Sequence, residues 1–181
     1  MRCKNSGFSF VELMIAMAVM AIGIVGAVAT QATAKKNGID ATQRSLALYM
    51  ANDILEKMRL NKTLLESYQG SSYGTASFST ESEANCSMAN VCSAEDMVTY
   101  DTVQWHWMLK GASVLDGENR VGGLIKPTGC IDHTNGYVTV VVSWLGRKES
   151  IDGALNATEF EESCGTGSNK RRQVTLAAHI Y

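Results

Sequence analysis

An apolar segment of membrane-spanning length, interrupted by one carboxylate, is the feature that most constrains how this chain can fold. Between Lys4 and Lys35 the only charged residue is Glu12, and the stretch from Phe8 to Ala29 is otherwise largely apolar. As a helix, these 22 residues would span about 33 Å, enough for the hydrocarbon core of a bilayer. A carboxylate in such a helix costs about 2.5 to 3.5 kcal/mol on insertion scales. The sequence therefore predicts a membrane helix in which Glu12 needs a partner.

The residues around this carboxylate form a specific motif. A short leader with two basic residues precedes Gly7, and the string from Gly7 to Glu12 reads Gly-Phe-Ser-Phe-Val-Glu. It resembles the type III signal of type IV pilins, in which a prepilin peptidase cuts after the glycine and methylates the new amino terminus. The resemblance implies cleavage between Gly7 and Phe8, N-methylation of Phe8, and pairing of Glu12 with the terminal amine of a neighbouring subunit.

Two other interpretations of the amino terminus stay open. A secretory signal peptide is one, because residues 27–29 read Ala-Val-Ala behind a basic start. Its apolar region would exceed the usual length of about 7 to 15 residues and would contain an acid. A simple uncleaved anchor is the other, and it leaves Glu12 unexplained.

Length and charge limit the remaining possibilities. A chain of 181 residues allows one membrane helix and one modest globular domain. Loss of a leader containing Arg2 and Lys4 leaves 14 basic and 18 acidic residues, a net charge near −4. That balance argues against nucleic acid as the main partner. The same two basic residues place the amino terminus in the cytoplasm and the rest of the chain in the periplasm, by the positive-inside rule.

A single long helix is predicted from Phe8 to about Asn61, since no proline occurs in this stretch. Its second half is amphipathic, and Asp53 with Lys57 forms a favourable i,i+4 pair. The apolar positions at helical spacing are Leu46 or Ala47, Met50, Ile54 and Met58. We expect this stripe to pack against a domain of the same chain.

The middle of the chain is predicted to be a loop followed by a helix. Residues 66–93 are rich in small polar residues, and their Gly-x-Ser-x-Gly string at 70–74 lacks the strand and helix that a hydrolase nucleophile needs. Ser93 then caps a helix with Asp96 three residues on. We expect the buried stripe of this helix to consist of Met97, Tyr100, Val103 and Trp107. Trp105 and His106 lie outside this stripe.

The carboxyl-terminal part is predicted to form antiparallel strands. Asn135-Gly136 is a hairpin turn signal, and alternate residues from Val138 to Trp144 point to one face. The last strand, Val174 to Tyr181, alternates in the same way. The basic run Lys170 to Arg172 is interpreted as a solvated turn before that strand, with a DNA contact or pairing to the acids at 159–162 of a neighbouring subunit as alternatives.

Four cysteines remain once Cys3 leaves with the leader, an even number on the exported side, where disulfides persist. Four cysteines allow three connectivities, and the sequence favours two bridges pairing Cys86 with Cys92 and Cys130 with Cys164.

Motifs for enzymatic chemistry are missing from the sequence. The three histidines show no metal-ligand spacing, and neither a Walker loop nor a dinucleotide fingerprint occurs. Asp116, Glu118 and Asn119 lack the ligand ladder of a calcium-binding EF-hand. We therefore expect no catalytic residues, no metal, no cofactor and no enzymatic activity.

Two further segments resemble the PilV group of minor pilins: residues 51–59, and the helix from Cys92 to Trp105. Ala29 stands where major pilins usually carry a helix-kinking proline, which also favours a minor pilin. The resemblance implies an α+β type IV pilin fold: leader 1–7, transmembrane and assembly helix 8–30, and periplasmic domain 31–181 with the amphipathic helix to about 61.

The same resemblance implies a function and partners. A minor pilin in the bacterial inner membrane would help to initiate pilus assembly and would join other minor pilins at the pilus tip. Its partners would be the prepilin peptidase, the inner-membrane assembly platform, the major pilin, other minor pilins and a tip adhesin. A minor pseudopilin of a type II secretion system is the alternative, and a tethered periplasmic hydrolase is a third hypothesis.

Overall fold

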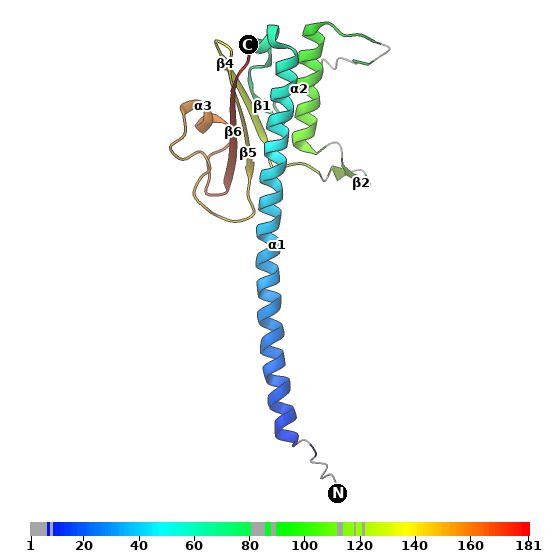
Figure 1. Cartoon of the computed structure of the whole chain (residues 1–181), viewed down its shortest axis with the longest axis vertical. Coiled ribbons are helices and arrows are strands. Elements are labelled where there is room, and N and C mark those ends of the chain that lie inside the picture. The colour runs from blue at the N-terminus through cyan, green and yellow to red at the C-terminus, as the bar shows by residue number, and fades with distance from the viewer. Residues whose placement is uncertain are drawn as a thin grey trace. The chain divides into compact units, whose positions relative to one another are not determined.

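The computed structural model describes Gly7 and residues 9–80, 86–87, 90–111, 114–117, 119–120 and 122–181. The chain divides into two compact units, Met1–Ile39 and Asp40–Tyr181. Helix α1, Phe10–Leu60, contributes to both units (Figure 1). Phe8, the expected new amino terminus, lies outside the described residues. The same is true of Glu118, in the loop that was compared with a calcium-binding EF-hand.

Helix α1 confirms the prediction of one long helix. It runs for 51 residues without a break at Ala29, Gly23 or Gly26. The only proline of the chain is Pro127, far from this helix in the sequence, so every residue of α1 keeps its main-chain N–H.

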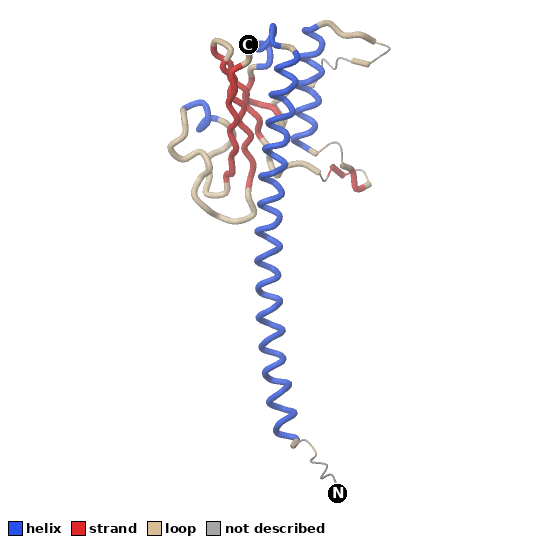
Figure 2. Tube along the Cα trace, in the orientation of Figure 1, coloured by secondary structure: helices blue, strands red, loops and turns tan. Residues whose placement is uncertain are grey.

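The second unit contains four-stranded and two-stranded antiparallel sheets (Figure 2). The larger sheet has the order β1-β4-β5-β6, with β1 at Gly70–Tyr73, β4 at Thr128–Thr134, β5 at Tyr137–Leu145 and β6 at Arg171–His179. The smaller sheet pairs β2, Leu115–Asp116, with β3, Asn119–Arg120. The helical elements after α1 are η1, Lys62–Tyr68, α2, Ala94–Lys110, and α3, Glu159–Ser163.

The hairpin between β4 and β5 forms at the predicted turn. Asn135 and Gly136 both have positive φ, 53° and 80°. A two-residue turn whose twist matches that of the flanking strands requires positive φ at both central residues, and asparagine and glycine adopt such dihedrals most readily. Thr134 therefore faces Tyr137, and Ile131 faces Val140.

One face of the sheet carries the main core. Val138, Val140, Val142 and Trp144 of β5 pack in one cluster with buried residues of α1 and α2. From α1 the cluster takes Ala47, Met50, Ala51, Ile54, Leu55 and Met58, which confirms the predicted amphipathic stripe. The fold is thus the α+β type IV pilin architecture, with a long helix packed against an antiparallel sheet.

The loop prediction for residues 66–93 is wrong at its start. Residues 62–68 form η1, and Gly70–Tyr73 form β1, which pairs with β4 at the edge of the sheet. The Gly-x-Ser-x-Gly string is therefore an edge strand. Its small polar residues gave no strand signal because an edge strand is specified by its partner as much as by its own side chains.

The stripe predicted for α2 is confirmed at Val103, which is buried, but it leaves out the most buried side chains of the helix. Trp105 is fully buried and His106 is 2% exposed, whereas Met97 is 36% exposed. Two surfaces cover α2 from different sides: Trp105 donates to a carbonyl of α1, and His106 stacks on Phe78 in the segment after β1. A single apolar stripe therefore could not predict which side chains of α2 are buried.

Candidate assembly site

Glu12 lies in the first turn of α1. The helix begins at Phe10, and the main-chain N–H of Leu13 donates to the carbonyl of Ser9 over 3.2 Å. Ser9 and Glu12 thus have the spacing of a capping box, which favours a helix start at this point. A carboxylate in the first turn also interacts favourably with the helix dipole. Gly7 is exposed and precedes the helix.

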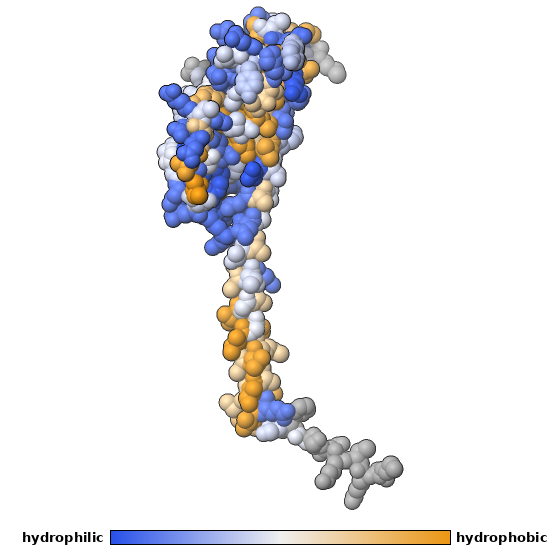
Figure 3. Space-filling model, turned by 60° about the vertical axis from the view of Figure 1, so that its left-hand side comes forward, coloured by the Kyte–Doolittle hydropathy of each residue, from blue (hydrophilic) through white to orange (hydrophobic). Residues whose placement is uncertain are grey.

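The first unit presents apolar side chains outward. Among the described residues, α1 is the one helix long and apolar enough to cross a membrane, and none of its most apolar stretch is buried. Figure 3 shows the hydrophobic surface along this part of the helix. Its large apolar residues, all more than half exposed, are Phe10, Val11, Leu13, Met14, Ile15, Met17, Val19, Met20, Ile22, Ile24, Val25 and Val28. Such a surface needs lipid or other subunits around it, and it anchors the amino terminus in the membrane.

Glu12 forms no ion pair with any residue that the structure describes. The next cation along α1 is Lys35, 23 residues away, which is about 35 Å at the rise of an α-helix. A charge in an apolar environment needs compensation. The described part of the first unit supplies no such partner for Glu12.

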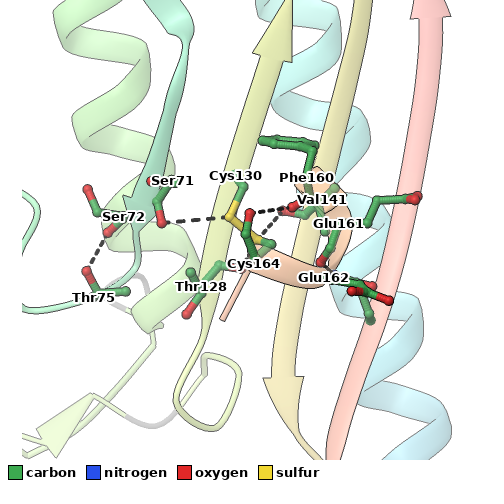
Figure 4. Close-up of a disulfide and its surroundings, with 12 residues drawn as sticks. Ser71, Ser72, Thr75, Thr128, Cys130, Val141, Phe160, Glu161, Glu162 and Cys164 are labelled. Carbon is green, nitrogen blue, oxygen red and sulfur yellow. Dashed lines mark hydrogen bonds between the residues drawn. A yellow bond between two sulfur atoms is a disulfide. The ribbon is translucent and has the colours of Figure 1, made fainter. Parts of the chain in front are cut away.

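Two disulfides hold the second unit. Cys86 bonds to Cys92, and Cys130 bonds to Cys164, with S–S distances of 2.03 and 2.01 Å. This is the pairing that the sequence favours. Figure 4 shows that Cys130–Cys164 lies beside Val141 and Phe160, on the face of the sheet away from the main core. The bridge ties the segment that carries α3 to the centre of the sheet.

Arg171 is a buried anchor, and the interpretation of Lys170 to Arg172 as a solvated turn is wrong for this residue. It is 6% exposed, and its guanidinium donates to Asp152 over 2.6 Å and to the carbonyl of Glu162 over 2.7 Å. Both partners belong to the same subunit, so the alternative pairing between subunits does not apply to Arg171. The pattern of the last strand did not indicate this burial, because the partner Asp152 lies 19 residues away in the sequence.

Asp152 organises the same segment. Its carboxylate also accepts from the main-chain N–H groups of Ala154, at 3.0 Å, and Ser168, at 2.9 Å. Partial burial raises the pKa of Asp152, but the hydrogen bond from Arg171, these two N–H donors and the charge of Arg171 outweigh it. The pKa therefore lies below its usual range.

A second buried polar contact joins η1 to α2. The hydroxyl of Tyr68 donates to the carboxylate of Asp101 over 2.8 Å. Burial raises the pKa of Asp101, although the hydrogen bond from Tyr68 and the charge of Lys57 oppose the shift. Sequence reasoning missed this pair because its members lie 33 residues apart.

Two of the three histidines have structural roles. His106 Nδ1 accepts from the main-chain N–H of Gly74, and His133 Nε2 accepts from that of Gly136, both over 3.0 Å. In the part of the chain that the structure describes, no group of three His, Cys, Asp or Glu residues is placed to hold a metal ion.

Comparison with known families gives two adjoining matches. Residues 2–28 match the prokaryotic N-terminal methylation motif, and residues 29–103 match the family described as type IV pilin Tt1218. No curated protein and no solved structure matches the chain. The methylation motif implies processing by a prepilin peptidase and assembly with other subunits, and the pilin family is structural and non-enzymatic. The motif at the start of α1, the uncovered apolar helix and the helix-on-sheet domain together make this chain a type IV pilin-like prepilin, with the role of a pilin or pseudopilin.

Proposed function

We propose that this chain is a minor pilin that helps to initiate and assemble a type IV pilus and sits in a complex with other minor pilins at the tip. The observation that carries the proposal is Glu12, which makes no ion pair with a described residue, at the start of the apolar segment of α1, whose large apolar side chains are exposed. An exposed apolar helical segment with one charge near its start is suited to pack against other helices of the same kind. An anchor for a soluble domain has no need of the charge.

We propose the following division of the chain. Residues 1–7 are the leader that the prepilin peptidase removes, and residues 8–30 are the transmembrane and assembly helix. Residues 31–181 form the domain exposed to the periplasm, with the leader on the cytoplasmic side of the inner membrane. Arg2 and Lys4 support this orientation because basic residues remain on the cytoplasmic side.

Glu12 is proposed to compensate the ammonium that cleavage creates at Phe8 of an adjacent subunit. The two charges would neutralise each other in the apolar core of the assembly, where an uncompensated charge costs several kcal/mol. The same pairing would fix the axial position of each new subunit relative to the previous one. The assembly platform of the inner membrane would bring the two subunits together.

A minor rather than a major pilin is favoured by the helix and by the domain. Ala29 in place of a kinking proline leaves α1 continuous through this position. The second unit adds loops fixed by two disulfides, and such surfaces are suited to specific contacts with a few neighbours, including a tip adhesin.

The test combines localisation with a deletion. An epitope-tagged full chain, expressed at its normal level, should be recovered with filaments sheared from the cell surface, at far lower abundance than the major pilin. A deletion strain should make fewer pili while the major pilin accumulates in the inner membrane. Exclusive retention in the envelope together with a protein-secretion defect would instead identify a pseudopilin of a type II secretion system. A normal pilus number in the deletion strain would contradict the role in initiation.

A further inference from the structure

A cavity of about 640 Å³ opens in the second unit at one end of the larger sheet. Strands β1 and β5 end there, and β4 and β6 begin there, so its walls come from all four strands or the loops next to them. The volume lies within the range of about 300 to 1,000 Å³ that is typical of small-molecule sites.

Hydrogen bonds tie several parts of the cavity wall to neighbouring segments. Arg171 in one wall is tied to Asp152, and the main-chain N–H of Leu145 donates to the carbonyl of Ile125 over 2.9 Å. The main-chain N–H of Gly146 donates to the carbonyl of Lys170 over 2.8 Å, and this bond joins the end of β5 to the start of β6. Cavity walls that are already ordered lose little entropy when a ligand binds.

Several polar side chains around the cavity have unused hydrogen-bonding capacity. Among the described residues, neither a side-chain hydrogen bond nor an ion pair engages the cavity residues Lys126, Thr128, Ser143, Thr166 and Asn169. Ser143 is only 3% exposed, so the small surface that it contributes to the cavity lies in a recess. Ser143 is buried and Thr128 is half-buried, and polar groups in such positions are normally paired, so a ligand or water must complete them. Lys126, Thr166 and Asn169 are exposed, so a ligand can reach them from solvent.

Gly165 preserves the space around Ser143. Its φ is 82°, and a Cβ at this position would lie 2.1 Å from Ser143 Oγ. Any side chain there would be strained and would collide with the hydroxyl. The segment before β6 can therefore pack this closely against Ser143 only with glycine at position 165.

The charges of the lining leave one cation without a counter-ion. Lys170 lies 3.8 Å from Glu149, and Arg171 is paired with Asp152. Lys126, on the rim, makes no ion pair with any described residue, and its φ of 46° is in a region that side-chain-bearing residues rarely adopt. The cavity thus offers one free positive charge beside hydroxyl and amide groups, which both donate and accept hydrogen bonds.

We propose that this cavity binds a sugar unit that carries a carboxylate. The carboxylate would pair with Lys126, and the sugar hydroxyls would bond to Thr128, Ser143, Thr166 and Asn169. Free sugar acids and uronate residues of a polysaccharide share this chemistry. The inference does not depend on the proposed function, because neither Gly7 nor Glu12 is involved.

Saturation-transfer NMR on the full chain in detergent micelles tests the proposal, with glucuronate, glucose and a glucuronate-containing oligosaccharide as probes. We expect saturable binding of glucuronate at millimolar concentration or below. Lys126→Gln should weaken the binding of glucuronate at least fivefold and leave that of glucose unchanged, while Asn169→Ala should weaken both. Lys62→Gln removes the same charge from η1, outside the cavity, and should have no effect. Tighter binding of the oligosaccharide than of glucuronate would identify a polysaccharide as the source of the bound sugar unit. Equal binding of the two would identify a free sugar acid as the ligand.

Three results would overturn the proposal. One is the absence of saturable binding of glucuronate at about 10 mM. Another is equal affinity for glucuronate in Lys126→Gln and Lys62→Gln, which would show that the charge of Lys126 does not contribute to binding. The third is an unchanged affinity in Asn169→Ala when circular dichroism shows that the variant is folded.

Discussion

The indole N–H of Trp105 donates a 2.8 Å hydrogen bond to the main-chain carbonyl of Met50, and both residues are buried. This bond joins α2 to α1 at the centre of the core. Tyr73 contacts the same indole edge-on, with ring centroids 5.2 Å apart. Trp105 therefore connects both helices with the edge strand of the sheet.

Trp105→Phe should lower the free energy of unfolding by about 2 kcal/mol or more, because it removes a buried hydrogen bond and leaves a cavity. Trp107→Phe is the matched control, since Trp107 is only partly buried and lies 5.0 Å from the ammonium of Lys110. Its effect should stay below about 1 kcal/mol. Guanidinium unfolding of the full chain in detergent, followed by near-ultraviolet circular dichroism, measures both. Equal losses would show that the contact with Met50 has no special weight.

The ion pair of Asp152 and Arg171 should make stability depend on pH. Because the folded-state pKa of Asp152 is depressed, its carboxylate stabilises the fold at pH values above the unfolded pKa, about 3.9. That contribution disappears as the pH falls through the lower folded-state value. Asp152→Asn should therefore be less stable than the parent at pH 7, and the difference should shrink towards pH 2. Asp132→Asn, whose carboxylate makes no ion pair among the described residues, is the control. A difference that does not change with pH would contradict the prediction.

The two disulfides should differ in their contribution to stability. Cys130 and Cys164 are 34 residues apart, and Cys86 and Cys92 are 6 apart. The chain-entropy relation gives roughly 3 to 4 kcal/mol for the longer loop and about 2 kcal/mol for the shorter one. Cys130 and Cys164 are also fully buried, so their loss leaves a cavity as well. Paired alanine variants of each bridge, compared by chemical unfolding, should show the larger loss for Cys130 and Cys164. The opposite order would refute this account.

Processing should occur between Gly7 and Phe8. Mass spectrometry of the mature protein should find N-methyl-phenylalanine at Phe8, and Gly7→Leu should retain the leader because the peptidase needs a small residue at the cut. Ser6→Ala, one position earlier, should be processed normally. A mature terminus at Thr30 would instead establish the secretory signal peptide.

The charge of Glu12 should be needed for assembly and dispensable for membrane insertion. Glu12→Val raises the apolarity of the segment, so the variant should enter the membrane and be cleaved, but it should be depleted at least tenfold from sheared filaments. Glu12→Gln, nearly the same size without the charge, should fail in the same way, whereas Glu12→Asp should retain part of the function. Quantitative immunoblots of membranes and filaments measure the ratio. Normal entry of Glu12→Val into filaments would exclude charge pairing as the mechanism.

Local sequence patterns were sufficient to predict those elements that are specified by their own residues. The long helix, its stripe from Ala47 to Met58, the capped start of α2 and the Asn135-Gly136 hairpin were all predicted from short-range spacing. Helix periodicity, capping and turn dihedrals depend on neighbouring residues, which the sequence displays directly.

Only the tertiary structure decided which sides of α2 are buried and what Arg171 contacts. The burial of Trp105 requires Gly129 of β4, where a Cβ would lie 2.5 Å from the indole ring. Arg171 is buried because a loop brings Asp152 to it from 19 residues away. The walls of the cavity likewise come from strands that are distant in sequence. Long-range pairing creates these environments, and a pattern read along one segment carries no information about the segment that will pack against it.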